Sequence, residues 1–276
     1  SACLVGSEMC IRDRLRALQH RGQEAWGMAV PGREPFRWLG LVTDRINDGL
    51  KVAVRHPSPV AIGHTRYSTV GKTVINNAQP VQIGASFSVA HNGTISNTED
   101  LVALIPPEYQ IPSWAGDTMI LGYRLHQLLE LHSDDWFQAF ETLSRELNGS
   151  YSLVFLTKEG DLYAARDERG FRPLCIGWHE ESSSYIVASE SCALSVLSAK
   201  LLRPVKPGEI LRIDEDGLTS HVFADEDRHA HCAFEYTYFA HPSSWIEGVN
   251  VYSARKKVGR ELAKLYDVKG DIVIPV

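Results

Sequence analysis

The sequence predicts an α+β fold in which helices pack on sheets. Two consecutive helix patterns lie between blocks of predicted strands, with no strand separating them. This order does not favour alternating strand–helix units, which place one helix after each strand. Short apolar segments bounded by turn residues are typical of β-strands, and we predict strands over 60–63, 85–91, 150–156, 161–165, 173–178, 184–189, 209–214 and 217–223.

The composition is that of a folded globular protein. The chain has 276 residues, of which 44% are hydrophobic and 22% charged, and both fractions are near the average for soluble domains. The net charge is −6, whereas a protein that binds duplex nucleic acid usually has a basic surplus. No segment approaches the roughly 20 apolar residues of a membrane span. We therefore expect neither a nucleic-acid partner nor a membrane partner.

The five cysteines are sparse and odd in number, and none of them forms a CxxC pair. Such a set argues against a disulfide framework and favours a reducing compartment. The first residues show no cationic segment followed by a long apolar run, so they do not resemble a secretory signal. We expect a cytoplasmic protein.

The predicted elements follow from their residue patterns. Segment 86–91 alternates at period two and runs into Asn92-Gly93, a strong signal for a hairpin turn. Asp117 is suited to be the N-cap of a helix that places Leu121, Leu125 and Leu128 on one face. A second helix begins near Ser133, repeats apolar residues and stops at Gly149; its apolar face comprises Trp136, Phe140, Leu143 and Leu147.

The pattern changes after residue 228. We predict an aromatic strand over 234–239, a basic helix over about 252–266 and an apolar strand over 272–276. The helix would turn Val258, Leu262 and Leu265 inward. A helix that leads into a buried strand normally begins a further unit, so 234–276 is predicted to open a second domain.

Four polar runs stand where predicted strands or helices end: 18–23, 63–71, 91–93 and 116–118. Together with Asn77-Ala78-Gln79-Pro80 they resemble the glutaminase domain of class II, N-terminal-nucleophile glutamine amidotransferases. Runs 18–24 and 232–239 resemble the amidophosphoribosyltransferase family in particular, and the match covers about 15–276. The resemblance implies a four-layer αββα sandwich, followed by the beginning of an α/β phosphoribosyltransferase domain.

The resemblance also implies a reaction. Enzymes of this family hydrolyse glutamine and pass the ammonia to phosphoribosyl pyrophosphate, which gives 5-phosphoribosylamine in the first step of de novo purine synthesis. The chain therefore looks like the glutaminase part of such an enzyme, with glutamine as its substrate. The resemblance further implies a homo-oligomer.

Site residues carry over from the family motifs to matching positions. Arg66 would clamp the α-carboxylate of glutamine, since a guanidinium holds a carboxylate bidentately. Asp117 would hold the α-amino group, and Asn92 and Gly93 would form the oxyanion hole. Thr69 and Arg21 would also contact the substrate. Without the resemblance, Arg66 reads as a surface arginine, Asn92-Gly93 as a turn and Asp117 as an N-cap.

The resemblance implies an N-terminal cysteine as nucleophile, with its own α-amine as the base. Cys3 is the candidate here, although Leu4 follows it where the family has glycine, and the spacing to the 18–24 run is shorter. Ser1 and Ala2 would have to be removed to free its amine. Residues 1–14 look foreign to the family and are predicted to replace its usual start, which leaves 15–233 as the glutaminase domain.

One cluster of residues is a candidate for a metal or a cofactor. His229, His231 and Cys232 lie close together but lack a fourth ligand at a suitable spacing, so we predict no metal and no cofactor in this chain. The resemblance implies Mg²⁺ for a phosphoribosyltransferase half, and an iron–sulfur cluster in some full-length members, with Cys232 as one candidate ligand.

Two alternatives to a working glutaminase stay open. The chain is a non-catalytic glutamine-binding fragment if it lacks its nucleophile. It is another class II amidotransferase if it feeds ammonia to a sugar phosphate or an aspartate derivative. The 18–24 and 232–239 runs speak against this second alternative.

Overall fold

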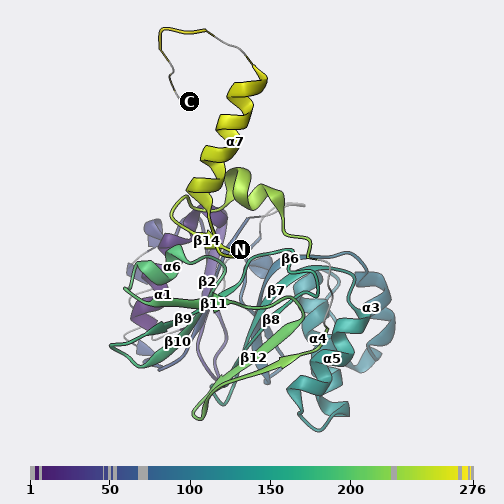
Figure 1. The fold of residues 1–276 in the computed structure, drawn as a ribbon. Coiled ribbons are helices and arrows are strands. Elements are labelled where there is room, and N and C mark those ends of the chain that lie inside the picture. Colours follow the sequence, from purple (N-terminus) through teal and green to yellow (C-terminus); the bar gives the residue numbers. More distant parts are fainter. Residues whose placement is uncertain are drawn as a thin grey trace.

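A computed structural model describes residues 4–5, 8–45, 47–48, 51, 55–67, 74–224, 229–266, 269–272 and 274, without the side chains of 4, 5, 8–10 and 12. Two antiparallel sheets form the body of the molecule (Figure 1). Across the described residues no helix is long and apolar enough to cross a bilayer.

Sheet A contains seven strands within the described residues, in the order β11-β9-β10-β1-β4-β2-β3. Every neighbouring pair in it is antiparallel. The bounds are β1 (Leu4–Val5), β2 (Ala25–Ala29), β3 (Phe36–Leu39), β4 (Ile62–Arg66), β9 (Cys175–His179), β10 (Ser184–Ala188) and β11 (Lys200–Pro204).

Sheet B contains six strands in the part of the chain that the structure describes, in the order β13-β12-β8-β7-β6-β5, again all antiparallel. The bounds are β5 (Val81–Ile83), β6 (Phe87–Ile95), β7 (Gly149–Thr157), β8 (Leu162–Arg166), β12 (Glu209–Asp214) and β13 (Gly217–Val222). The eight predicted strands correspond to β4, β6, β7, β8, β9, β10, β12 and β13.

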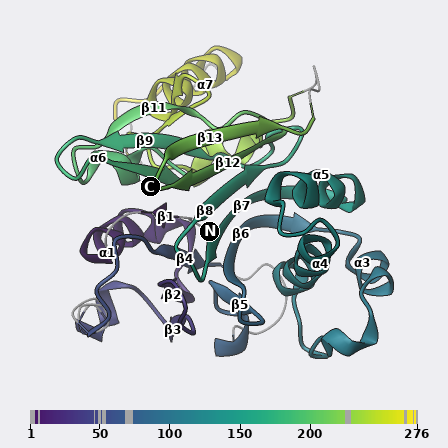
Figure 2. The ribbon, with the colours of Figure 1, turned by 90° about the horizontal axis from the view of Figure 1, so that it is seen from below.

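Helices cover the outer face of each sheet, which gives four layers (Figure 2). Helices α1 (Glu8–Ala17) and α6 (Cys192–Ser195) lie on sheet A, while α3 (Thr98–Leu104), α4 (Asp117–Leu131) and α5 (Trp136–Glu146) lie on the side of sheet B. Short 3₁₀ turns connect these elements at Gln19–Arg21, Thr43–Arg45, Ile75–Asn77 and Pro107–Tyr109. The predicted αββα sandwich is therefore confirmed.

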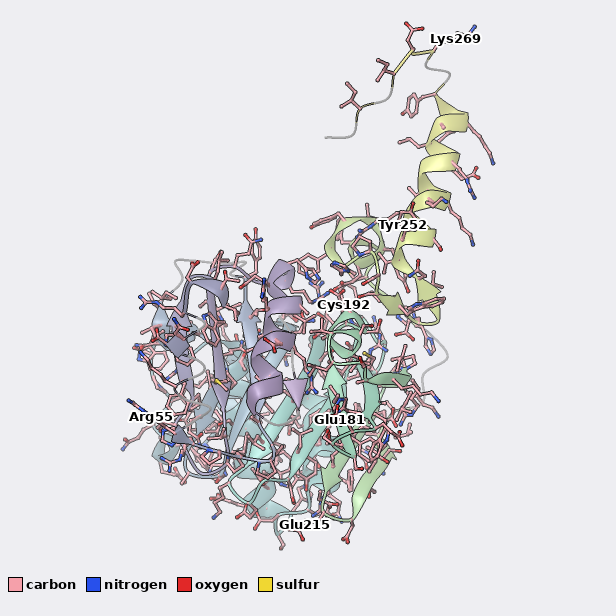
Figure 3. All side chains as sticks on the ribbon, turned by 90° about the vertical axis from the view of Figure 1, so that its left-hand side faces the viewer. Arg55, Glu181, Cys192, Glu215, Tyr252 and Lys269 are labelled. Atoms are coloured by element: carbon pink, nitrogen blue, oxygen red, sulfur yellow. The ribbon has the colours of Figure 1, made fainter. Side chains whose placement is uncertain are left out.

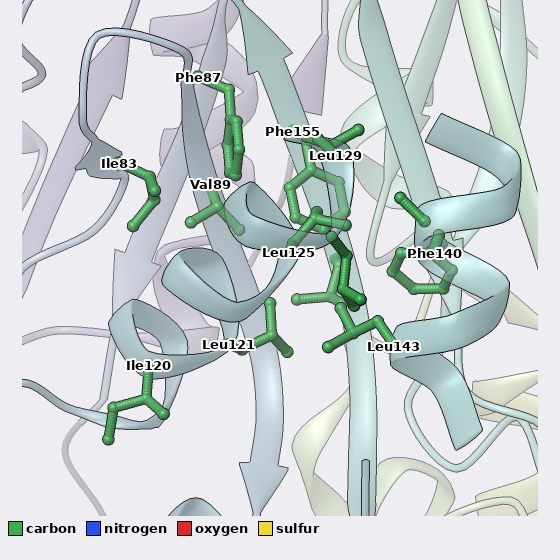
Figure 4. Packing of buried hydrophobic residues seen from close by; sticks show 14 of the residues in the cluster. Ile83, Phe87, Val89, Ile120, Leu121, Leu125, Leu129, Phe140, Leu143 and Phe155 are labelled. Atoms are coloured by element: carbon green, nitrogen blue, oxygen red, sulfur yellow. The ribbon is translucent and has the colours of Figure 1, made fainter. Parts of the chain in front are cut away.

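Three apolar clusters hold the layers together. Ile62, Ala90 and Val154 belong to the cluster between the two sheets. On the outer face of sheet B, the predicted stripes of α4 and α5 face aromatic strand residues, as Leu125 and Phe140 do with Phe155 (Figure 4). Because burial of a large apolar side chain contributes about 1.5–3 kcal/mol, these clusters fix the sheets against each other and against their helices.

Residues near the N-terminus belong to the sandwich. Strand β1 pairs with β10 on one side and with β4 on the other, so it lies inside sheet A. Ile11 and Leu15 of α1 are fully buried in the cluster on that sheet. Segments 4–5 and 8–17 thus take part in the fold, and the foreign origin of 1–14 stays a prediction.

The predicted aromatic strand over 234–239 is wrong, because Glu235–Phe239 forms a π-helical turn. Phe234 and Tyr238 are four residues apart, their rings are in contact at 5.8 Å, and both are exposed. Glu235 between them is buried and pairs with Arg21. That ion pair turns the acidic residue inward, which the period-two aromatic pattern of a strand would not do.

The predicted basic helix is α7 (Val251–Leu265), which follows the small hairpin of β14 (Trp245–Ile246) and β15 (Val249–Asn250). It projects from the sandwich, and Tyr252 and Lys269 lie clear of the body in Figure 3. The expectation that Val258, Leu262 and Leu265 face inward is wrong, because all three are more than half exposed. Of the strand predicted over 272–276, residues 273, 275 and 276 lie outside the description, and 272 and 274 form no strand.

Candidate active site

A cavity of about 430 Å³ lies where the end of β4, the second half of β6 and the first turn of α4 meet. This volume is within the usual range for sites that bind small molecules. Polar side chains from all three elements line it, and its described lining includes His64, Arg66, His91, Gly93, Asp117 and Thr118.

Arg66 contributes a cation to this cavity from the last position of β4. Its guanidinium Nε is buried and has no hydrogen-bond partner among the described residues. Burial lowers the pKa of Arg66, and the carboxylates of Asp117 and Glu24 partly offset this effect. Because arginine stays protonated in proteins, the cavity presents a positive charge.

Asp117 stands at the first turn of α4, but the predicted N-cap role is wrong, because Gly116 is the N-cap. The carboxylate of Asp117 accepts a hydrogen bond from the backbone N–H of Ile95 at 3.1 Å, and another from that of Thr118 at 2.7 Å. The first of these bonds ties the end of β6 to α4. The side chain is about 30% exposed, so it presents a negative charge at the cavity wall within the field of Arg66.

Asn92 and Gly93 do not form the predicted hairpin turn. Strand β6 continues through them to Ile95, and they pair with Ser152 and Tyr151 of β7. Gly93 has a φ of 154°, and a Cβ there would lie 2.0 Å from the carbonyl oxygen of Ser150. The glycine is therefore required by the close approach of the β7 backbone and not by a turn.

The side chain of Asn92 is nearly fully buried, and its Nδ2 has no hydrogen-bond partner in the described part of the chain. Buried amide donors are normally paired, because an unmade hydrogen bond costs about 1–3 kcal/mol. A donor left unpaired beside a polar cavity is suited to a ligand oxygen. Gly93, the next residue, lines that cavity.

Arg21 was expected to contact the substrate, and the structure places it elsewhere. It is fully buried, forms an ion pair with Glu190 and donates to both carboxylate oxygens of Glu235, at 2.9 and 2.7 Å. Although burial opposes charge, the two carboxylates raise the pKa of Arg21. The guanidinium is engaged with the segment that follows residue 233 and is not among the described residues that line the cavity.

Glu190 joins this buried cluster to the loop that contains His241 and Ser244. Its carboxylate accepts hydrogen bonds from the backbone N–H of His241 at 2.8 Å and from Ser244 Oγ at 2.7 Å. Burial opposes its ionisation, but His20 and Arg21 outweigh that effect and hold the pKa of Glu190 below its usual range. The cluster thus has paired charges and a structural role.

Two predicted site residues, Cys3 and Thr69, lie outside the described residues. Their described neighbours adjoin the cavity. Leu4 pairs with Gly63, which precedes the cavity residue His64.

The sequence motifs contain four further residues to which the sequence alone assigned no role: His64, Gln79, His91 and Thr118. The structure joins three of them, because Gln79 Nε2 donates to Thr118 Oγ1 at 3.0 Å and Gln79 Oε1 accepts from the backbone N–H of His91 at 2.7 Å. Burial lowers the pKa values of His64 and His91. One signal was available for His64, since it shares an inward register with Ile62 but is polar.

The trio near residue 230 does not form a metal site. His231 Nδ1 lies 3.0 Å from the carbonyl oxygen of Gly170, and Arg172 approaches the sulfur of Cys232 at 3.8 Å. Within the described residues no group of three or more His, Cys, Asp and Glu side chains is arranged to hold a metal ion. Among the described residues, no group of thiolates of the kind that holds an iron–sulfur cluster surrounds Cys232.

Comparison with known sequences identifies relatives of this chain. A family model described as a glutamine amidotransferase domain matches residues 64–196. An amidophosphoribosyltransferase of Methanocaldococcus jannaschii is 37% identical over 95% of this chain and 59% of its own length. One of Mycobacterium bovis is 40% identical over 95% of this chain and 50% of its own length. The chain thus spans about half to three fifths of these curated relatives.

Solved structures give the same result. The glutamine phosphoribosylpyrophosphate amidotransferase of B. subtilis, complexed with ADP and GMP, matches 98% of this chain and 59% of its own with a TM-score of 0.85 and 32% identity. A class II glutamine aminotransferase domain protein from Silicibacter pomeroyi matches 82% of this chain with a TM-score of 0.54. Its 18% identity supports the shared fold alone.

Proposed function

Because this chain belongs to the glutamine amidotransferase family, we propose that its cavity binds glutamine and hydrolyses the side-chain amide. This is the glutaminase half of the amidophosphoribosyltransferase reaction. In the complete enzyme the ammonia would react with phosphoribosyl pyrophosphate to give 5-phosphoribosylamine. Residues 15–233, together with the segments 4–5 and 8–17 that pack in the sandwich, would form the glutaminase domain, and 234–276 would begin the phosphoribosyltransferase domain.

The two charges of the cavity suit the amino-acid head of glutamine. Arg66 would pair with its α-carboxylate, and Asp117 would accept hydrogen bonds from its α-ammonium group. Both side chains are held by their elements, Arg66 by the end of β4 and Asp117 by its hydrogen bond from Ile95. This arrangement orients the substrate with little further ordering.

The observation that carries the proposal is the unpaired, buried Nδ2 of Asn92, which lies in the chain between His91 and Gly93, two residues of the cavity that holds Arg66 and Asp117. Attack on an amide carbon moves charge onto its oxygen, and fixed donors stabilise that oxyanion. Strand alternation directs the backbone N–H of Gly93 to the same edge of β6 as that of His91. There, β5 no longer pairs with β6, because their last pair is Val81 with Val89.

Cys3 is the proposed nucleophile. Its thiolate would add to the amide carbon, and collapse of the tetrahedral adduct would break the C–N bond, release ammonia and leave a thioester. Water would then hydrolyse the thioester to glutamate and regenerate the thiol. An α-amine on Cys3 itself would accept the thiol proton, since its pKa is about 8, and this requires removal of Ser1 and Ala2.

The resemblance extends the proposal to the complete enzyme. A phosphoribosyltransferase half would use Mg²⁺ with phosphoribosyl pyrophosphate, and the enzyme would be a homo-oligomer. An iron–sulfur cluster in that enzyme would need ligands other than those that surround Cys232 here. The protein would act in the cytoplasm.

Labelling with a diazoketone analogue of glutamine, read by intact mass and peptide mapping, tests the proposed function. We expect one adduct, on Cys3 of chains that lack Ser1 and Ala2, and protection by excess glutamine. Arg66→Met should slow the labelling, whereas Arg37→Met on strand β3 should not. Glutamine binding without an adduct or ammonia release would favour the non-catalytic alternative, and the absence of both binding and labelling would overturn the proposal.

A further inference from the structure

Both backbone groups of His91 are bound by buried side chains. Its N–H donates to Oε1 of Gln79 at 2.7 Å, and its carbonyl oxygen accepts from Nε2 of His64 at 3.1 Å. Gln79 is 6% exposed and His64 is 0% exposed. The next two residues in the chain are Asn92 and Gly93. The two side chains therefore hold the main chain at His91, directly before the proposed oxyanion donors.

These two hydrogen bonds replace those that a neighbouring strand would make with β6 at His91. Strand β5 pairs with β6 only from Val81 opposite Val89 to Ile83 opposite Phe87. At His91 no β5 residue pairs with β6 in the described chain, and a strand edge without a partner leaves backbone groups unsatisfied. The Gln79 side chain supplies the acceptor, and His64 supplies the donor from the opposite sheet.

The two contacts have different origins in the fold. Gln79 is tied to α4, because its Nε2 donates to Thr118 Oγ1 at 3.0 Å. His64 lies on β4, two residues before Arg66. The His91 peptide is therefore joined on one side to the helix that begins with Asp117, and on the other to the strand that ends with Arg66.

The hydrogen bond defines the state of His64. A carbonyl oxygen only accepts, so Nε2 carries the proton, and the buried ring is neutral because its pKa lies well below the usual value. Nδ1 then has a lone pair and no partner among the described residues. A replacement that keeps a donor at the Nε2 position therefore keeps the contact with His91.

We propose that His64 and Gln79 are positioning residues that hold the His91 peptide and thereby aim the Asn92 and Gly93 donors at the scissile amide. The role in catalysis rests on the proposed glutaminase function. They act through His91, and neither is assigned to contact the reacting atoms. Both residues also line the cavity, but the charges proposed to hold glutamine belong to Arg66 and Asp117, so the effect of the positioning residues should appear mainly in kcat.

Matched variants of the full chain separate positioning from simple loss of polarity. His64→Gln places an amide N–H near the Nε2 position, whereas His64→Asn places it near Nδ1, too short to reach His91. Gln79→Met removes the acceptor for the His91 N–H at similar volume. Gln82→Met is the control, because Gln82 lies on β5 and accepts from Ser88 Oγ, away from the cavity.

Two readouts are measured on each variant: glutaminase kinetics, and hydrogen exchange of the Asn92 and Gly93 amides. A misplacement of about 1 Å costs on the order of 10²-fold in rate. We expect His64→Asn and Gln79→Met to lower kcat about 10- to 100-fold with KM for glutamine within about twofold. They should also speed exchange at residues 92 and 93, while His64→Gln and Gln82→Met stay close to wild type.

The kinetic and the hydrogen-exchange readouts test the two proposals separately. If the wild-type chain binds glutamine but releases no ammonia, the non-catalytic alternative is favoured, and the exchange data still decide whether His64 and Gln79 hold the main chain at His91. Wild-type exchange and kcat in both His64→Asn and Gln79→Met would overturn the positioning role. If His64→Asn does not fold, Gln79→Met against Gln82→Met gives the same decision.

Discussion

Two buried polar clusters of this protein differ in whether their groups have partners. In the Arg21 cluster, formed by Arg21, Glu190 and Glu235, opposite charges meet directly. The second cluster, here called the cavity cluster, comprises the cavity residues Arg66 and Asp117 together with Asn92, which precedes the cavity residue Gly93. In it, Arg66 Nε and Asn92 Nδ2 lack partners within the described residues. Removing one partner of a buried ion pair destabilises a fold, whereas an unpaired buried donor has lost water without gaining a bond. The difference points to a ligand for the second cluster only.

Breaking the Arg21 cluster should have the largest effect on stability. Glu190→Ala leaves the guanidinium of Arg21 with one buried carboxylate and removes the acceptor for Ser244 Oγ. We expect the free energy of unfolding to fall by about 3–5 kcal/mol, measured by denaturant titration. The control is Glu141→Ala, because Glu141 forms an exposed pair with Arg145, four residues on, that is worth about 0.3–0.5 kcal/mol. Equal losses in the two variants would contradict the account.

Removing an unpaired donor should damage catalysis more than stability. Asn92→Ala should lower kcat about 10²- to 10³-fold, with little change in KM, since loss of one oxyanion donor costs about 2.7–4 kcal/mol in the transition state. Asn97→Ala is matched to it, because Asn97 lies just beyond the end of β6 and has its amide paired with the carbonyl oxygen of Glu146. That variant should lose stability and keep kcat. Steady-state ammonia release measures kcat in both variants. An unchanged kcat in Asn92→Ala would refute the oxyanion role.

Arg66→Met should act on binding. Charge-assisted hydrogen bonds contribute about 1.5–3 kcal/mol, so we expect KM for glutamine to rise roughly 10- to 150-fold. Arg37→Met serves as the control, since Arg37 on β3 is not among the described residues that line the cavity. An unchanged KM in Arg66→Met would refute the proposed binding of the α-carboxylate of glutamine by Arg66.

The buried histidines predict a smaller effect, seen in acid. Burial lowers the pKa values of His64 and His91, so both are neutral in the folded protein near pH 7. The unfolded chain takes up these protons as the pH falls below about 6.5. Their contribution to stability is therefore complete above that pH and declines as the pH falls toward the lower folded pKa values.

His64→Gln removes one of these two groups and should flatten the decline. The expected difference is up to about 1.4 kcal/mol per pH unit between pH 6.5 and 5.5. Denaturant titrations of both proteins at these two pH values measure it. The same acid dependence in His64→Gln and wild type would show that His64 is not buried as a neutral ring.

The sequence predicted the sandwich where residue patterns are local and strong. The stripe of Leu121, Leu125 and Leu128 identified α4, and the alternation over 86–91 identified the first part of β6. Strand β2 was missed because all five of its residues are buried and do not alternate. Strand β11 was missed because Lys200–Pro204 places two leucines between charged residues without alternation, ends in proline, and lies at the sheet edge.

The site was predictable in part, for a similar reason. Arg66, Gly93 and Asp117 meet at one cavity, as the family motifs implied. Arg21 could not be placed, because its role depends on Glu190 and Glu235, which lie 169 and 214 residues away in the chain. The prediction that Asn92-Gly93 forms a turn was wrong. The glycine is required by the close approach of the β7 backbone, a contact that the local sequence does not reveal.

Glutamine binding, measured by titration calorimetry, tests the central claim most directly, because it does not depend on the nucleophile. We expect one glutamine to bind per chain, and affinity to fall roughly 10- to 150-fold in Arg66→Met while Arg37→Met binds as wild type does. No binding to the wild-type chain, or equal affinity in wild type and Arg66→Met, would contradict the assignment of this cavity to glutamine.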